Sequence, residues 1–468
     1  MFLVENEIKM IIDAGIEILE KSGAQVMGEE ALEVFKNNNC IVEGKQVRIP
    51  RNIIEECLRS TPSRWILYDR EGNERLFMGE GKTYYGSADV ASRFLDYKTG
   101  KVRDFRLNDS RQAVKLMDKL QNIDFVCPFG TPQDISQEIT SANAFEGVVS
   151  NTTKPIGFMT LDIKNFKSII EIACAVRKGS DSLRKKPFIM TLIESVSPLS
   201  LSEEASLKVL IMAEKGLPFF FSSAPSIGGT SPVTIAGTLA IVVAETLLGL
   251  VLAQLKNKGT PLGIGAGIGI IDLKTGTYSL ASPETALGMA GFIQICKYLK
   301  IPNWSTSVTQ SKLPDRQASI EGMLPILLNN MVGADVNWDI GYLESALYTS
   351  YEEVVILDET IGMVRRVKQG IEVNDNTIAK DLIIEIGSQG SYLNSPHTFK
   401  NFKKQLWFPT LVERLPYDGW VEKGKLSMQD RAKNKIDEIL STDDDKGLSS
   451  DIKSKISKIL ASLGEKKL

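Results

Sequence analysis

A unit made of a strand followed by a helix recurs along most of this chain. Its clearest copy begins with the apolar run Phe219-Phe220-Phe221 behind Pro218, and a loop rich in glycine, serine and proline follows. A long helical stretch covers residues 233–256, and a second strand opens at Pro261. A strand, a helix and a second strand within about 45 residues are typical of a parallel βαβ crossover.

Eight candidate strands share this pattern, and each is followed by a helical stretch. They are residues 83–86, 125–128, 155–160, 187–193, 218–222, 261–266, 302–306 and 334–341. Eight strands that alternate with helices over about 290 residues favour an α/β fold of the (β/α)8 TIM-barrel type. An open doubly wound sheet is the alternative, because a count of strands does not prove closure.

The flanking segments differ from this repeat. Residues 1–82 have apolar positions at helical spacing and then short alternating runs, which predicts an N-terminal extension of helices and strands. We expect the barrel domain to comprise residues 83–370 and a C-terminal helical segment to comprise residues 371–468. The last 45 residues resemble two charged amphipathic helices, which we interpret as a peripheral arm.

Charge and cysteine usage exclude several classes of protein. The net charge of −3 offers no broad basic face for nucleic acid or for an anionic membrane. The five cysteines are odd in number and widely spaced, without a CxxC pair, which favours reduced thiols in a cytoplasm. Residues 1–10 lack the basic and apolar regions of a signal peptide. A cytoplasmic protein is therefore expected.

One stretch, residues 235–255, is long and apolar enough to raise the question of a membrane span. It contains Glu245 and Gln254 and lies between two strand-like runs, so we interpret it as a buried helix. A helix that is apolar on nearly all sides needs cover beyond one sheet. We therefore expect a subunit interface at this helix and a homo-oligomer.

Several kinds of chemistry lack their residues. His397 is the single histidine and no two cysteines are close in sequence, so we expect no metal site. No P-loop motif occurs. The glycine-rich run 263–269 lacks the spacing of a dinucleotide fingerprint, and we prefer a tight turn at a strand end to a nucleotide site. A Ser-His-Asp triad would have to use His397, which lies outside the repeat.

The carboxyl ends of the strands are where a TIM barrel carries its site. The candidate substrate-binding residues there are Tyr84, Tyr85, Asp89, Glu194, Ser222, Gln310, Trp338 and Glu344, and His397 is a further candidate. Aromatic faces, hydroxyls and carboxylates without a strong base or thiol suit an organic cation better than acid–base catalysis. We expect the rings of Tyr85 and Trp338 to flank the cation and Glu194 to face them. Core packing for the rings and salt bridges for Glu194 and Glu344 are the alternatives.

Several motifs, in one order, resemble the trimethylamine methyltransferase family. They are residues 229–240 (GTSPVTIAGTLA), Glu245 in the following helix, 281–284 (ASPE), 314–321 (PDRQASIE), 397–398 (HT) and 406–409 (LWFP). The similarity extends from about residue 5 to about residue 420. The resemblance implies a TIM barrel, in agreement with the strand count, and transfer of a methyl group from an amine to a cognate corrinoid protein. It implies no directly bound cofactor, because the partner carries the corrinoid.

The founding members of this family carry pyrrolysine in the barrel cavity, and this chain consists of standard residues only. We expect the loop at residues 307–312 to correspond to the position of pyrrolysine in those members. Members without pyrrolysine are associated with quaternary amines such as glycine betaine, proline betaine and carnitine. A quaternary ammonium loses a methyl group as a neutral amine leaves, so neither a base nor zinc is required. The alternatives are a tertiary methylamine substrate, a non-catalytic betaine-binding barrel and an aldolase-like lyase.

Overall fold

The strands of the computed structural model form a closed parallel barrel. The model describes residues 2–442 and 446–464. Seven strands pair in the order β6 (Tyr84–Tyr85), β18 (Val336–Trp338), β17 (Asn303–Thr306), β14 (Leu262–Ala266), β12 (Phe219–Ser223), β10 (Ile189–Glu194) and β9 (Ile156–Phe158). Parallel bridges from Gly86 to Phe125 and from Val126 to Ile156 insert an eighth short strand between the two edges. The predicted TIM barrel is confirmed, and the open sheet is wrong.

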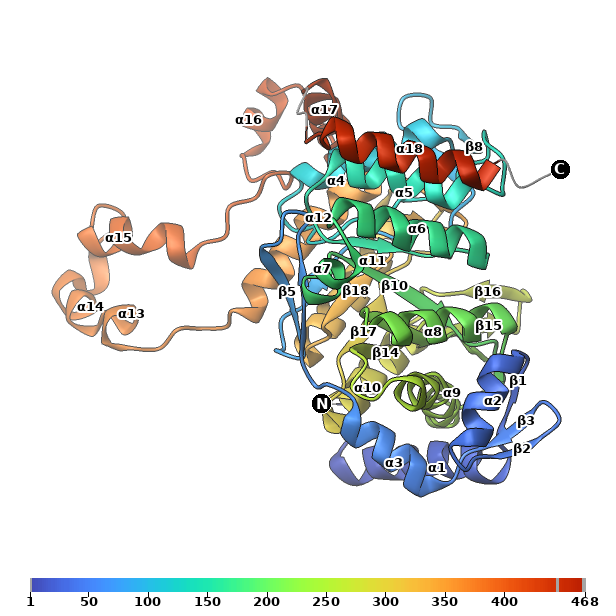
Figure 1. Cartoon of the computed structure of the whole chain (residues 1–468). Helices are drawn as coiled ribbons and strands as arrows, with labels where there is room; N and C mark the ends of the chain where they lie inside the picture. Colours follow the sequence, from blue (N-terminus) through green and yellow to red (C-terminus); the bar gives the residue numbers. More distant parts are fainter. Residues whose placement is uncertain (1, 443–445, 465–468) are drawn as a thin grey trace.

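A helix follows each barrel strand and covers the outside of the barrel (Figure 1). These helices are α4 (Leu107–Lys119), α5 (Thr140–Asn151), α6 (Ile163–Val176), α8 (Glu203–Lys215), α9 (Ile235–Lys256), α10 (Pro283–Leu299), α11 (Arg316–Val332) and α12 (Tyr351–Lys368), with a short α7 (Ser180–Lys185) after α6. Side chains of Ser202, Ser282 and Ser350 cap three of them by accepting a backbone N–H of the first turn. Gly333 ends α11 in the left-handed conformation.

Large aromatic rings fill the middle of the barrel. The ring of Trp338 lies 5.0 Å from that of Phe125 and 6.5 Å from that of Trp304. Glycines provide the room: a Cβ on Gly157 would lie 2.6 Å from Trp338, and one on Gly265 would lie 2.0 Å from Trp304. The glycine-rich run therefore begins as strand β14 and makes room for rings, so the predicted tight turn is wrong.

A hairpin closes the barrel at the amino ends of its strands. It consists of β4 (Trp65–Tyr68) and β5 (Glu74–Met78). The Trp65 ring lies 5.5 Å from the ring of Phe220 inside the barrel, and the backbone N–H of Phe77 donates to the Tyr84 hydroxyl at 3.0 Å. Access to the interior is therefore expected from the other end.

The N-terminal extension covers the apolar helix α9. It contains α1 (Glu5–Lys21), β1 (Ala24–Val26), α2 (Glu29–Asn37), β2 (Ile41–Glu43), β3 (Gln46–Arg48) and α3 (Arg51–Ser60). Helices α1, α2 and α3 pack on α9, and the most apolar window of α9 is 78% buried. The helix is thus a core element and not a membrane span. The chain itself supplies the cover expected from a second subunit, so α9 gives no reason to expect an oligomer.

Two small sheets surround the carboxyl ends of the barrel strands. One has the order β19 (Tyr342–Leu343), β20 (Tyr348–Thr349), β7 (Arg93–Leu95) and β8 (Val102–Asp104). The other has the order β13 (Ser226–Ile227), β15 (Gly269–Asp272) and β16 (Thr277–Ser279). β1 of the N-terminal extension also pairs with β11 (Ser200–Leu201), which follows β10. The loops at this end are therefore structured.

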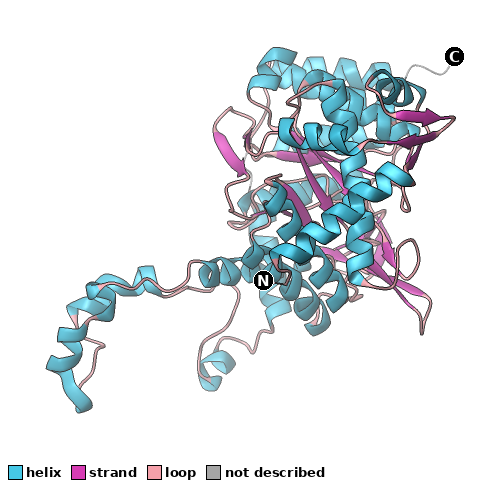
Figure 2. Ribbon diagram, turned by 90° about the horizontal axis from the view of Figure 1, so that it is seen from below, coloured by secondary structure: helices cyan, strands magenta, loops and turns pink. Residues whose placement is uncertain are grey.

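The C-terminal segment has a projecting part and a part that packs on the barrel. Helices α13 (Asp375–Ile378), α14 (Lys380–Ile386), η1 (Gly387–Gln389) and α15 (Pro396–Gln405) project from the molecule, as Figures 1 and 2 show. After α16 (Tyr417–Glu422), helix α17 (Met428–Ser441) packs on α12 and α4, and α18 (Ser450–Gly464) packs on α6. The prediction of a peripheral arm in the last 45 residues is wrong, because the arm precedes them.

Candidate functional site

Three carboxylates lie at the carboxyl ends of the barrel strands. Asp89 follows β6, Glu194 is the last residue of β10, and Asp339 follows β18 directly. They are close enough that the charge of Asp339 raises the pKa of Asp89 and the charge of Glu194 raises the pKa of Asp339. Asp89 and Glu194 were predicted site residues, and the barrel brings them together with an acid that we did not predict.

Asp89 is buried and only partly hydrogen-bonded. Its Oδ2 accepts the backbone N–H of Met159 at 2.7 Å, and its Oδ1 has no partner in the described part of the chain. Burial raises the pKa of Asp89 to about 7, the Met159 hydrogen bond opposes this rise, and the Asp339 charge adds to it. A buried carboxylate without a cation is costly, so this site favours a positively charged ligand.

Asp339 and Glu194 are shifted in the same direction. Burial raises the pKa of Asp339 to about 7, the Thr306 hydroxyl opposes the rise, and the charge of Glu194 adds to it. Burial also raises the pKa of Glu194, against a lowering effect of the Ser222 hydroxyl. Neighbouring carboxylates destabilise one another's ionised forms, and a cation that lies between them stabilises those forms.

Buried Glu245 of α9 holds the loops beside this cluster. Its carboxylate accepts hydrogen bonds from the hydroxyls of Ser195 (2.9 Å), Ser197 (2.7 Å) and Ser223 (2.6 Å). It also accepts the backbone N–H of Leu199 at 2.8 Å. A carboxylate with four donors is fully satisfied, so Glu245 positions the ends of β10 and β12.

Both predicted tyrosines lie away from this end of the barrel. Tyr84 points inward but lies at the amino ends of the strands, where its hydroxyl accepts from Phe77. Tyr85 points outward, where its hydroxyl accepts from Asn330 Nδ2 at 2.9 Å and Arg365 lies 5.4 Å from its ring centroid. Successive residues of a strand face opposite sides, and Tyr85 is on the helix side. It therefore does not flank a cation together with Trp338.

The remaining predicted residues are spread over the aromatic core, the outer loops and the projecting arm. Trp338 is 1% exposed within the aromatic core, below the carboxylates. Gln310 Oε1 accepts from the Ser345 hydroxyl in the loops that follow β17 and β18, and Glu344 lies near Tyr348 in the same region. His397 lies on the projecting arm, where its Nε2 is 2.8 Å from the Asn376 carbonyl oxygen. His397 is therefore remote from the carboxylate cluster.

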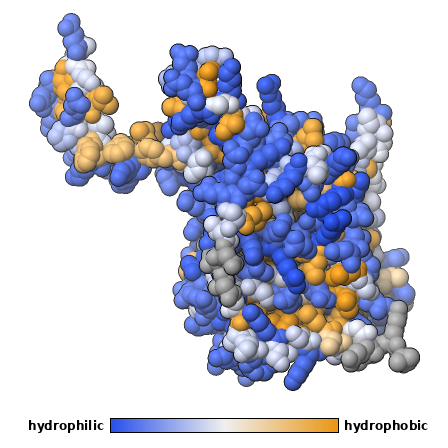
Figure 3. Space-filling view, turned by 90° about the horizontal axis from the view of Figure 1, so that it is seen from above, coloured by the Kyte–Doolittle hydropathy of each residue, from blue (hydrophilic) through white to orange (hydrophobic). Residues whose placement is uncertain are grey.

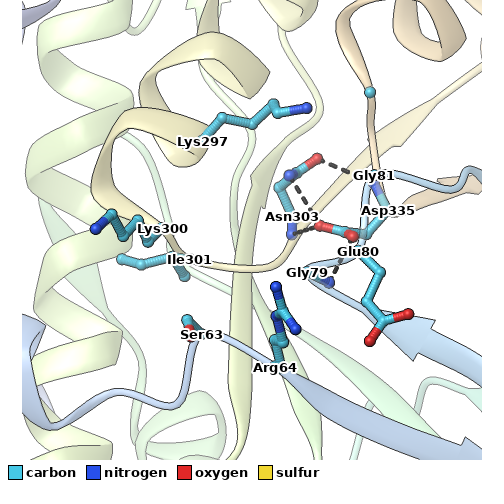
Figure 4. A pocket seen from close by; sticks show the side chains of 11 residues that line it. Ser63, Arg64, Gly79, Glu80, Gly81, Lys297, Lys300, Ile301, Asn303 and Asp335 are labelled. Atoms are coloured by element: carbon cyan, nitrogen blue, oxygen red, sulfur yellow. Dashed lines mark hydrogen bonds between the residues drawn. The ribbon is translucent and has the colours of Figure 1, made fainter.

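A cavity lies at the opposite end of the barrel, and Figure 4 shows the residues that line it. It has a volume of about 620 Å³, and its lining includes Lys297, Asn303 and Asp335. The Asp335 carboxylate accepts from Asn303 Nδ2 at 3.0 Å and from the Gly79 backbone N–H at 2.7 Å. No predicted site residue lines this cavity. Asp335, the buried one of the two acids that line the cavity, is already hydrogen-bonded, so we assign its carboxylate a structural role.

The carboxylate cluster lacks the arrangement of a metal centre. In the described ranges, no three His, Cys, Asp or Glu side chains are grouped so that they could hold a metal ion. The cluster instead combines carboxylates with the buried hydroxyls of Ser222 and Thr306. Such a site can bind an organic cation and can strip water from it, which changes the energy of a reaction at that cation.

Fold and site together define a TIM-barrel protein with an anionic site at the carboxyl ends of its strands. The chain matches the family "Trimethylamine methyltransferase (MTTB)" over residues 1–463. It is 30% identical to the trimethylamine methyltransferase MttB of Desulfitobacterium hafniense (strain DSM 10664 / DCB-2), over 92% of this chain and 87% of that protein. It is also 30% identical to the glycine betaine methyltransferase of Desulfitobacterium hafniense (strain Y51), over 99% of this chain and 97% of that protein. The chain belongs to the trimethylamine methyltransferase family and is a methyltransferase.

Solved structures agree with the fold. The monomethylamine methyltransferase MtmB of Methanosarcina barkeri aligns with a TM-score of 0.54 at 11% identity, covering 100% of this chain and 89% of that one. A hydroxylamine complex of MtmB aligns with a TM-score of 0.55 at 12% identity, covering 94% and 88%. At such low identity the likeness concerns the barrel alone.

Proposed function

We propose that this methyltransferase moves an N-methyl group from a quaternary amine, such as glycine betaine, proline betaine or carnitine, to Co(I) of a corrinoid carried by a partner protein. The observation that carries the proposal is the cluster of Asp89, Glu194 and Asp339, which has no cation of its own in the described structure. A permanent positive charge is what this cluster lacks. The substrate class is not decided by identity, because the trimethylamine and glycine betaine relatives are equally distant.

The reaction needs no proton transfer from the protein. The bond between nitrogen and the methyl carbon breaks, and its electron pair stays on nitrogen, so that a neutral tertiary amine leaves. The electron pair of Co(I) forms the new bond to the methyl carbon, which yields methyl-Co(III). The protein orients one N-methyl group outward and desolvates the cation, so it acts through positioning.

Exposed aliphatic side chains in the loops around this end suit a protein partner. They are Val90, Leu161, Val196, Val233, Leu273, Leu313 and Leu347, and 46–83% of each is exposed. Each lies between a barrel strand and the next barrel helix, so together they surround the carboxylates. Apolar residues collected on one face indicate a binding surface. We name them the rim and propose that the corrinoid protein contacts it.

The test is to mix the pure enzyme with a Co(I) corrinoid protein and a panel of amines. We expect methyl-Co(III) absorbance with at least one quaternary amine and release of the matching tertiary amine. Methylation with trimethylamine but with no quaternary amine would assign the tertiary substrate instead. Tight betaine binding without methyl transfer to any corrinoid partner would leave a non-catalytic binding barrel.

A further inference from the structure

The projecting arm, residues 371–405, has no core of its own. None of the residues of α13, α14, η1 and α15, all of which the structure describes, is buried. The exposed fractions are 91% for Ile371, 71% for Ile384, 79% for Leu393 and 82% for Phe399. Figure 3 shows apolar residues along this projection. Burial of apolar surface is what offsets the entropy of ordering a chain, so an arm with these residues needs cover.

The arm is nevertheless firmly attached at its base. Arg366 of α12 donates to the carbonyl oxygens of Gly370 (3.2 Å), just before the arm, and of Gln405 (2.8 Å), the last residue of the arm. Glu359 of α12 accepts the backbone N–H groups of Leu411 (2.8 Å) and Val412 (2.9 Å) just beyond it. The base is thus fixed in direction, and the arm extends away from its own barrel (Figures 1 and 2).

A matching uncovered surface lies on α11. Like α9, this helix is apolar around much of its circumference, and its charged residues are Arg316 and Glu321, both near its start. The N-terminal extension covers α9, whereas Ile320, Leu324 and Met331 of α11 stay 71%, 37% and 51% exposed. We name these three residues the α11 face. Lys368 Nζ donates to the carbonyl oxygens of Asn330 and Met331, so the face ends beside the base of the arm.

We propose that two copies of this chain exchange their arms, so that the arm of each copy packs on the α11 face of the other. A two-fold axis makes both contacts equivalent and covers both apolar surfaces at once. Each side of a standard interface contributes roughly 20–30 residues. The arm, residues 371–405, is long enough to supply one side. Within it four lysines offset four carboxylates, so charge does not oppose the contact.

The corrinoid protein fits the arm less well than a second copy does. Helix α12 runs antiparallel to the barrel strands, so its last residue, Lys368, lies at their amino ends. The rim and strands β15 and β16 are at the carboxyl ends, on the other side of the molecule from the arm in Figure 1. A partner seated on the rim therefore leaves the arm free. The dimer does not depend on the proposed reaction, because both surfaces lie outside the site.

Sedimentation velocity on the full chain tests the proposal. We expect a two-chain species at micromolar concentration, and a monomer throughout that range would overturn it. Ile320→Asp with Leu324→Asp alters the face, and Ile384→Asp with Phe399→Asp alters the arm. Each pair should weaken the dimer by about 100-fold, because charges enter an apolar contact. Far-UV circular dichroism and the melting temperature check that these exposed substitutions leave the fold intact.

Two further measurements separate the contact from other modes of association. Met10→Asp with Ile41→Asp, at N-terminal positions 64% and 50% exposed, is the matched control and should leave the dimer unchanged. Mixing the face variant with the arm variant pairs one intact arm with one intact face, so dimers should return in the mixture alone. A mixture that stays monomeric would mean that the arm of one copy does not bind the α11 face of another, and a face variant that dimerises normally would mean that the arm binds elsewhere, for example to a second arm. Either result overturns the proposal.

Discussion

At the scale of single residues, Asp339 is the sharpest test of the carboxylate cluster. Asp339→Asn removes one charge and keeps the shape, and asparagine tolerates the left-handed backbone found there (φ 66°). We expect quaternary-amine affinity to fall by about 1–2 kcal/mol, because one charge contact is lost, without a loss of melting temperature. Titration calorimetry measures the affinity. Glu344→Gln, between β19 and β20, is the control, and equal losses of affinity in both variants would remove Asp339 from the site.

The same carboxylates predict how binding depends on pH. The pKa values of Asp89 and Asp339 are raised to about 7, and an ammonium binds their ionised forms. Affinity for a quaternary amine should therefore rise with pH up to about 7 and level off above it, and binding near pH 6 should release protons. Calorimetry in buffers of different ionisation enthalpy measures that release. If the affinity stays constant from about pH 5.5 to about pH 8, Asp89 and Asp339 do not bind the amine.

The unliganded protein should show the linked effect on stability. A carboxyl whose folded pKa is above its unfolded value, about 3.9 for Asp, holds its proton better in the folded state. These two groups therefore stabilise the folded state fully at low pH, and their contribution is lost as the pH rises to about 7. A saturating quaternary amine should reduce this loss.

Trp338 belongs to the core, and its substitution should act on stability first. Trp338→Leu opens a cavity against Phe125 and Trp304, so we expect a loss of about 2–4 kcal/mol in the free energy of unfolding. Trp338→Phe should lose about half as much free energy of unfolding. Melting temperature and betaine affinity are measured on both variants. A stable Leu variant that binds betaine poorly would instead return Trp338 to the cation site.

The position of a residue in its strand predicted where along the barrel axis it lies better than whether its side chain points into the barrel. Asp89 and Glu194 could be predicted because any residue at the end of a barrel strand lies near the mouth. Tyr85 could not, because two adjacent tyrosines in a two-residue strand do not reveal which one faces inward. Asp339 was missed because the predicted eighth strand, residues 334–341, extends past it, whereas β18 ends at Trp338. The acid next to Trp338 was the available signal.

At the scale of elements, the crossing of α1 and α9 explains how an apolar helix stays inside one chain. A Cβ on Gly15 of α1 would lie 2.5 Å from Val243 Cγ1. Gly15→Val should therefore separate the helices and cost about 1–3 kcal/mol in the free energy of unfolding. Met10→Val on the exposed side of α1 is the control for helix propensity, and chemical denaturation measures both. Equal stabilities would show that the close approach is unimportant.

The helix itself could be predicted from residues 235–255, whereas its cover could not. Apolar positions all around a helix indicate that it is buried, but they do not identify the element that covers it. The sequence of α9 is equally compatible with a second subunit and with the chain's own α1, α2 and α3. Only the packing distinguishes them. The same ambiguity applied to α11, whose face the described chain leaves open.

At the scale of the whole molecule, the rim and the carboxylate cluster should be separable. Leu161 and Leu273 are 83% and 76% exposed in the loops that follow β9 and β14, two strands that are not neighbours in the barrel, and neither residue belongs to the carboxylate cluster. If the corrinoid protein docks there, Leu161→Asp with Leu273→Asp should raise its KM by about tenfold through lost apolar contact. Betaine affinity and the sedimentation of the enzyme should stay unchanged. Met10→Asp is the matched control. A fall in betaine affinity would mean that these loops shape the substrate site, and an unchanged KM would place the partner on another surface.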